Sequence, residues 1–153
     1  LWKSLYNSFD ELTLRSSENE RQLLSPYSHR FSALTIGAQK KNQVTDVADG
    51  MFKLERTIRL YQLALDGSQC HSNLDSPTIQ LPTRNRLRVL ADTQGASWKR
   101  RDYFVNAVQN PGSMQVTQPY FSISDGTLCI TLSVMTRIEG GDYIICCDIL
   151  FER

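Results

Sequence analysis

Residues Tyr143–Phe151 read YIICCDILF, a run that is apolar apart from two thiols and one acid, Asp148. The run follows Gly140–Gly141, and a short apolar segment after such a turn predicts a β-strand that is buried on both faces. An ionised carboxylate is costly to bury unless it is paired or hydrogen-bonded. Asp148 therefore requires either a protein partner or a cationic ligand, and the two alternatives imply different functions.

Two further strands are predicted before this run. Residues Leu128–Thr136 alternate strictly between an apolar face and a face of mostly small or polar side chains. Residues Met114–Ile123 form the preceding strand, and Asp125–Gly126 supplies the turn between the two. The three strands predict an antiparallel meander, with one face against helices and the other lining a pocket or water.

The beginning of the chain has helical periodicity. Residues Leu1–Leu24 carry an apolar stripe formed by Leu1, Leu5, Phe9 and Leu12. Ser25–Pro26 is expected to break this helix, because proline lacks a backbone donor. Further helices are predicted over Tyr27–Gln39 and Thr45–Arg56. The apolar stripe either packs on the sheet or forms a dimer seam that continues a transmembrane helix.

The middle of the chain predicts a hairpin and a long connection. Residues Arg59–Leu65 form a strand, Asp66–Gly67 is a strong hairpin turn, and Gln69–Asn73 is the returning strand. Residues Leu74–Gln94 are rich in proline and polar residues, which predicts a long loop of the kind that often serves as a lid.

One more helix is predicted before the meander. Ser97 is expected to cap a helix through Trp98–Val108, which Asn110–Pro111–Gly112 ends. The whole order predicts an α+β fold with a five-stranded antiparallel sheet, a long N-terminal helix and a cover of helix and loop. The chain is expected to be a single domain over 1–153, with a helical segment at 1–56 and the sheet with its covering loops at 57–153.

Composition limits the classes of function. The 153 residues include 17 basic and 16 acidic ones, so charge gives no reason to propose a nucleic-acid partner. No apolar run approaches the roughly 20 residues of a membrane helix. The chain opens without an initiator methionine and is expected to be a fragment of a longer protein.

The sequence lacks the patterns of a metal, cofactor or catalytic site. Its four cysteines include no CxxC pair, and the two histidines have no metal-like spacing with them. The cysteines are expected to pack as small buried hydrophobes rather than to sense redox state. No GxSxG, GxGxxG or P-loop occurs, so this fragment is not expected to be an enzyme or to hold a cofactor or metal.

Four strings of sequence resemble the Cache family of extracytoplasmic, PAS-like sensor domains. They are LYQLALDGSQCHSN at Leu60–Asn73, WKRRDYFVNAV at Trp98–Val108, QPYFSISDGTLCITLSV at Gln118–Val134, and YIICCDI at Tyr143–Ile149. In that family they correspond to the first hairpin, the helix of the ligand loop, the central strand pair and the last strand. The resemblance covers about the last two thirds of the chain.

The resemblance implies a sensor of small molecules in the periplasmic part of a bacterial inner-membrane protein. Such domains are often dimers, and they pass ligand occupancy to a cytoplasmic output domain of a chemoreceptor, a kinase or a cyclic-di-GMP enzyme. The wording of Gln118–Ser133 resembles most the modules of cyclic-di-GMP enzymes. The expected partners are a small ligand, an amine or a carboxylate, and a second copy held through the N-terminal helix.

The resemblance also implies a ligand site at Arg101, Tyr103, Tyr120 and Asp148. Family members that bind amino acids hold the carboxylate with an arginine and nearby aromatics, and hold the amine with an aspartate late in the sheet. This chain departs from that pattern twice. Tyr103 stands where the pattern has a tryptophan, and Ser122 stands where it has an acid.

Other interpretations remain open for these residues. Arg101 could be an exposed helix charge, and Asp148 could be a structural acid that is paired with a buried arginine. The alternative function is a PAS-like interaction or dimerisation module whose pocket is filled by its own side chains.

Overall fold

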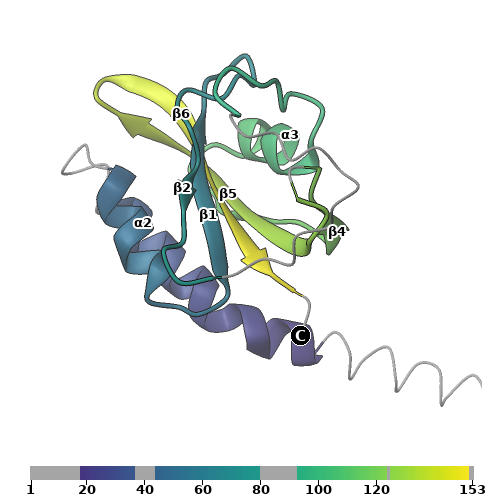
Figure 1. The fold of residues 1–153 in the computed structure, drawn as a ribbon. Helices are drawn as coiled ribbons and strands as arrows, with labels where there is room; N and C mark the ends of the chain where they lie inside the picture. Colours follow the sequence, from purple (N-terminus) through teal and green to yellow (C-terminus); the bar gives the residue numbers. More distant parts are fainter. Residues whose placement is uncertain (1–17, 37–43, 80–92, 124, 152–153) are drawn as a thin grey trace, which may run out of the picture.

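The computed structural model describes residues 18–36, 44–79, 93–123 and 125–151. Within these ranges the chain forms an antiparallel sheet with helices on both faces (Figure 1). The strand order is β2-β1-β6-β5-β3, and β4 also pairs with β5. The predicted α+β class is therefore confirmed, although the described residues form six strands where the sequence predicted five.

Three long strands form the centre of the sheet. They are β1 at Thr57–Leu63, β5 at Leu128–Ile138 and β6 at Gly141–Leu150. The last strand in the sequence, β6, lies between the other two, and residues 144–149 of this strand are buried. The prediction that this run is buried on both faces is confirmed, because a central strand is covered from both sides.

Three short strands lie at the sides. They are β2 at Leu74–Asp75, β3 at Gln115–Val116 and β4 at Tyr120–Phe121. The predicted strand Met114–Ile123 is thus divided between β3 and β4, and part of the predicted loop from Leu74 onwards is the strand β2. The division falls where Pro119 has no N–H to donate to a ladder.

The turn after β1 was predicted correctly, but the returning strand was not. Gly67 has a φ of 87°, as the predicted Asp66–Gly67 turn requires. Only Gln69 then pairs with β1, in an isolated bridge to Leu63, before the chain leaves and returns as β2. Most of the predicted lid, residues 80–92, lies outside the described residues.

One continuous helix runs through residues 18–36, so the predicted break at Ser25–Pro26 is wrong. Proline in a helix interior removes one hydrogen bond and strains the preceding turn. Here the Pro26 side chain is exposed, while Leu24, Tyr27 and Phe31 on both sides of it are buried against the sheet. Burial of this apolar stripe outweighs the lost bond. The predicted stripe of Leu1–Leu12 lies outside the described residues.

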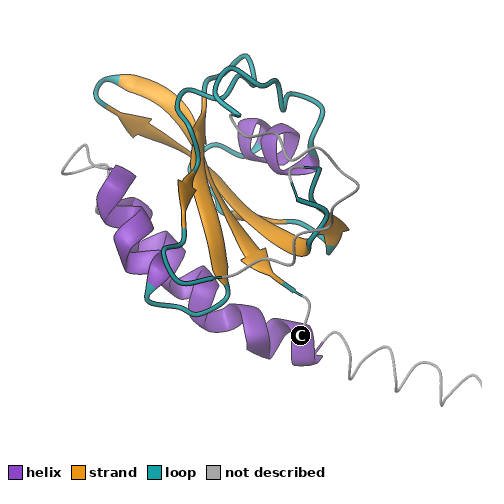
Figure 2. Cartoon of the chain, viewed as in Figure 1, coloured by secondary structure: helices purple, strands orange, loops and turns teal. Residues whose placement is uncertain are grey.

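The helix α2, Val44–Phe52, covers the same face of the sheet as residues 18–36 (Figure 2). Its buried residues Val47 and Met51 join that helix and the sheet in one apolar core. The helix ends at Phe52, four residues before the predicted end. After Phe52 the chain contacts the helix through residues 18–36 instead. The backbone N–H of Arg56 donates a hydrogen bond to the Tyr27 hydroxyl over 2.9 Å.

The helix α3, Asp102–Gln109, covers the opposite face. The predicted cap at Ser97 is wrong, because Arg101 is the N-cap and no side chain caps this helix. Residues 98–100 form turns instead, and the Trp98 N–H donates to the carbonyl of Gly67 over 2.8 Å. The predicted end at Asn110 is confirmed. In the described part of the chain, no helix has the length and apolarity to cross a membrane.

Candidate functional site

A polar row crosses the central strands on the face that α3 covers. Arg59 of β1 lies directly opposite Asp148 of β6, which lies directly opposite Thr131 of β5. All three side chains are buried. Because residues in register on neighbouring strands have adjacent Cβ atoms, this pairing brings the three polar groups together.

A β-bulge lies directly before Arg59 in β1. The register between β1 and β6 shifts between Thr57 and Arg59, so that Ile58 is the extra residue. Thr57 consequently bonds to the Met51 carbonyl on the α2 side, while Arg59 lies on the α3 side. A shift of one residue reverses the face of a side chain, so the bulge turns Thr57 to the α2 side, while Arg59 keeps the regular register that sets it opposite Asp148.

Asp148 is held by two hydroxyl donors and one ion pair. Its Oδ1 accepts hydrogen bonds from the Thr131 hydroxyl over 2.7 Å and from the Tyr61 hydroxyl over 3.0 Å. Its Oδ2 lies 3.6 Å from Nε of Arg59. Burial raises the pKa of Asp148 above its usual value, and Arg59 and the two hydroxyls offset part of that rise. Asp148, the acid that is unexpected in this apolar strand, is therefore paired with groups of the protein itself.

Arg59 has a second acidic partner. Its terminal nitrogen forms an ion pair with Oδ2 of Asp125, which lies between β4 and β5. The other oxygen of Asp125 accepts bonds from the backbone N–H of Thr127 over 2.9 Å and from its hydroxyl over 2.5 Å. The guanidinium thus links the predicted Asp125–Gly126 turn to the middle of the sheet.

Three tyrosines line the same space. The rings of Tyr61 and Tyr103 meet edge to face with centroids 6.1 Å apart, and those of Tyr103 and Tyr120 lie 6.3 Å apart. Tyr120 also shares a hydrogen bond with the hydroxyl of Thr131. Burial raises the pKa of all three tyrosines, so their hydroxyls remain neutral at physiological pH.

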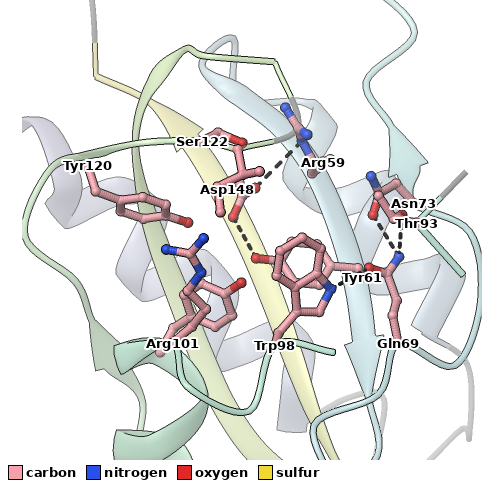
Figure 3. A pocket seen from close by; sticks show the side chains of 12 residues that line it. Arg59, Tyr61, Gln69, Asn73, Thr93, Trp98, Arg101, Tyr120, Ser122 and Asp148 are labelled. Carbon is pink, nitrogen blue, oxygen red and sulfur yellow. Dashed lines mark hydrogen bonds and ion pairs between the residues drawn. The ribbon is translucent and has the colours of Figure 1, made fainter. Parts of the chain in front are cut away.

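Arg101 lies at the N-terminus of α3 and is half-buried. Figure 3 shows its guanidinium between Tyr120 and Trp98, on the side of the space where Asp148 lies. Among the described residues, no carboxylate forms an ion pair with it and no acceptor forms a hydrogen bond with it. A cation in this position can bind an anion with two parallel donors.

The opposite wall is a hydrogen-bonded cluster around the buried side chain of Gln69. Its Oε1 accepts from the indole of Trp98 over 2.9 Å. Its Nε2 donates to the side chains of Asn73 over 2.8 Å and Thr93 over 2.9 Å (Figure 3). These bonds join the hairpin, the segment after residue 92 and the start of the α3 region, so the wall is fixed from three parts of the chain.

Together these side chains enclose a small pocket. Its volume is about 320 Å³ when the open solvent at its mouth is included. The space in which the centre of a water molecule fits is only about 20 Å³. That is room for about one water molecule. A larger ligand would require the side chains to move apart.

All four residues that the sequence predicted, Arg101, Tyr103, Tyr120 and Asp148, line this pocket, and Ser122 lines it as well. Sequence analysis missed several others: Arg59, Tyr61, Gln69, Trp98 and Thr131. A signal for Arg59 was present, since it is the only charge in the run TIRLYQL and is as anomalous there as Asp148 is in its own strand.

The buried cysteines adjoin the site without lining the pocket: Cys146 packs with Tyr61 and Tyr103, and Cys129 lies opposite Tyr120. All four cysteines are free thiols, and Cys129, Cys146 and Cys147 are buried. Burial raises the pKa of each of these three, to about 12 for Cys129. Across the described ranges, no group of three or more His, Cys, Asp or Glu side chains is arranged to hold a metal ion.

The sequence matches no protein-family model and no curated protein. Similar solved structures do exist. The YkuI protein of Bacillus subtilis, which has an EAL domain and was solved with its substrate c-di-GMP and calcium, is 13% identical over 99% of this chain and 38% of its own, with a TM-score of 0.63.

Two chemoreceptors are also similar. The ligand-binding domain of CtaA from Pseudomonas fluorescens, solved with L-alanine, is 14% identical over 95% of this chain and 60% of its own, with a TM-score of 0.57. The sensory domain of Tlp3 from Campylobacter jejuni, solved with isoleucine, is 13% identical over 97% of this chain and 62% of its own, with a TM-score of 0.52.

The chain has the fold of a Cache sensor domain. At these identities the similarity establishes the shared fold. This Cache-fold domain spans less than two thirds of each of the three similar chains. What it binds has to be argued from its own pocket.

Proposed function

We propose that this Cache-fold domain senses a small molecule in the pocket lined by Arg101, Tyr103, Tyr120 and Asp148. The observation that carries the proposal is the Arg101 guanidinium, which faces an aromatic-walled pocket with no acidic partner among the described residues. A charged group directed into a concave site with aromatic walls is characteristic of a ligand site. The domain itself is proposed to bind its ligand without catalysis.

The proposed parent is a membrane-bound bacterial signal-transduction protein with this domain on the extracytoplasmic, periplasmic side. The structural similarity to the chemoreceptors CtaA and Tlp3 supports this setting. The similarity to YkuI, a protein with an EAL domain, supports an output in cyclic-di-GMP signalling. A homodimer through the N-terminal helix remains a prediction, because its proposed seam lies before residue 18.

A second candidate function follows from the small free volume of the pocket. Tyr61 and Tyr103 pack together between the sheet and α3, and they line the pocket together with Arg59. A PAS-like interaction module with a self-filled pocket would have this appearance. The two candidates differ in whether any small molecule stabilises the folded domain.

A thermal-shift screen with amino acids, carboxylates and amines separates the candidates. A ligand that binds only the folded state raises its stability by RT ln(1 + [L]/Kd), or about 2.7 kcal/mol at a hundred times Kd. A sensor shows at least one such concentration-dependent rise. Amide chemical-shift changes for the hit should then concentrate at the four pocket residues. No rise with any compound would leave the interaction module as the better account.

A further inference from the structure

Two acids contact Arg59, Asp148 in the pocket lining and Asp125 behind it, and both already have partners in the protein. Asp148 has two hydroxyl donors on Oδ1 and the Arg59 guanidinium opposite Oδ2. Asp125 has two donors from Thr127 on one oxygen and the Arg59 guanidinium on the other. Each of the four carboxylate oxygens therefore faces a donor from the protein, and neither acid is waiting for a cation.

The donors at the pocket are not all occupied. Nε of Arg59 is fully buried, and it has no hydrogen-bond partner even though Asp148 lies 3.6 Å away. Arg101 presents a second guanidinium to the same space, without an acceptor among the described residues. A guanidinium offers five N–H donors and no acceptor. The unmet requirement of the site is therefore for acceptors.

We propose that the pocket binds a small carboxylate that carries no ammonium group, and that Arg59 is the residue that excludes the ammonium. This inference rests on the proposed function. Arg101 binds the carboxylate of the ligand, while the rings of Tyr103, Tyr120 and Trp98 enclose its apolar part.

Arg59 excludes an ammonium by occupying its place. An ammonium approaching Asp148 would come close to a buried like charge, which disfavours its charged form. Oδ1 of Asp148 already accepts two hydrogen bonds, so only Oδ2, beside the Arg59 guanidinium, could accept from the three N–H donors of the ammonium. A buried donor without an acceptor costs the free energy of its desolvation. The hydroxyl of Ser122, where the amino-acid pattern has an acid, adds no carboxylate to compensate.

The test compares ligands that share a carbon skeleton. Calorimetric titrations at pH 7 and constant ionic strength use propionate, L-alanine and ethylamine, and then isovalerate, L-valine and isobutylamine. We expect at least one carboxylate to bind at least about tenfold more tightly than its amino acid, and neither amine to bind. Equal or tighter binding of the amino acid would overturn the inference and leave the proposed function standing.

Failure of the proposed function has a different result. If neither these six compounds nor any compound of the thermal-shift screen binds, the domain is not a small-molecule sensor, and the inference fails with it. If the screen finds a longer carboxylate, the same comparison is made on its own skeleton, with the same expected order.

Matched variants locate the binding. Arg101→Gln should weaken binding of the carboxylate at least about tenfold, because it removes a charge-assisted pair of bonds. Arg100→Gln removes the same charge one residue away, at an exposed side chain that does not line this pocket, and should leave binding unchanged. Equal losses in the two variants would show that only the general charge matters, which contradicts the proposed contact.

Two further variants test the exclusion of the ammonium. Arg59→Gln should allow L-alanine to bind, because Oδ2 of Asp148 loses its cation. If this variant does not fold, Asp148→Asn decides the question, since it retains the shape of the side chain. Carboxylate affinity should rise in Asp148→Asn, because a negative charge beside the ligand carboxylate is removed and Arg59 loses one acidic partner. A tenfold loss of L-alanine affinity in Asp148→Asn would show that Asp148 holds a ligand ammonium and would overturn the inference.

Discussion

Arg59 and Asp148 are cross-strand partners on β1 and β6, with Nε and Oδ2 3.6 Å apart and both side chains about 95% buried. Removal of one partner from a buried pair is more costly than the pair is stabilising, because it leaves an uncompensated charge. Arg59 also holds Asp125, so it compensates two acids at once.

Arg59→Met should destabilise the domain by about 3–5 kcal/mol, because two acids lose their cation. The double variant Arg59→Met, Asp148→Asn should recover part of that loss, with a coupling energy of about 0.5–3 kcal/mol. Urea denaturation of the four proteins in the cycle gives this quantity. Simple additivity of the two single losses would mean that the pair does not interact.

Thr131→Val should cost about 1.5–3 kcal/mol, since it removes a buried hydroxyl that donates to a carboxylate. The shape of the side chain is nearly unchanged, so packing contributes little. Thr45→Val on the exposed surface of α2 is the control and should stay within about 0.5 kcal/mol of the wild type. The two free energies of unfolding are compared in urea; equal values would contradict the role given to Thr131.

The raised pKa of Asp148 has a defined effect on stability. The folded state holds this proton more tightly than the unfolded state. The resulting stabilisation is complete below the unfolded pKa and is lost as pH rises through the folded one. The stability of the wild type relative to Asp148→Asn should therefore fall as pH rises from about 3.9, the usual value of an aspartate, into the mildly acidic range. A relative gain over that window would show that Arg59 and the hydroxyls outweigh desolvation.

The thiols should react in two classes. Burial raises the thiol pKa of all four cysteines, but Cys70 is only half-buried, whereas Cys129, Cys146 and Cys147 are buried and have the larger rises in pKa. A raised pKa lowers the fraction of thiolate, which is the reactive form. One thiol should therefore react readily with a disulfide reagent at pH 8, and three more only in denaturant. The Cys70→Ser variant should lose the first class alone.

Pro26→Ala should stabilise the domain by up to about 3 kcal/mol, the usual penalty of proline in a helix interior. The exposed position means that no packing is lost. Ser25→Ala, one residue earlier and also exposed, is the control, with an expected change below about 1 kcal/mol. A destabilising effect of Pro26→Ala would mean that Pro26 stands in the first turn of a second helix and not in the interior of one helix.

The sequence predicted correctly those elements whose conformation follows from their local hydrophobic pattern. The alternation of Leu128–Thr136 and the apolar run of Tyr143–Phe151 gave two central strands, because their periods report burial directly. Pro26 and Ser97 were misjudged because tertiary contacts decided both. Burial of the apolar stripe within residues 24–31 stabilises the helix on both sides of the proline. The hydrogen bond from the Trp98 N–H to the Gly67 carbonyl holds the residues after Ser97 outside the helix.

The candidate site divides in the same way. Arg101, Tyr103, Tyr120 and Asp148 could be named from the sequence, because they occupy positions of a known pattern. The partner of Asp148 could not. Arg59 meets Asp148 because β1 pairs with β6 in a register that sets the two residues opposite each other, and neither strand's own pattern shows which strand is its neighbour or in what register they pair.

The hydrogen bond from the Arg56 N–H to the Tyr27 hydroxyl connects the start of β1 to the helix through residues 18–36. Arg56 also accepts a backbone bond from Leu150, two residues beyond Asp148, and lies three residues before Arg59. Arg59 thus lies three residues from Arg56, which bonds to Tyr27 of the helix through residues 18–36. Asp148 lies two residues from Leu150, which bonds to Arg56. The buried pair and the helix through residues 18–36 are therefore joined by three residues of backbone and one hydrogen bond, which is a short path between the pocket and that helix.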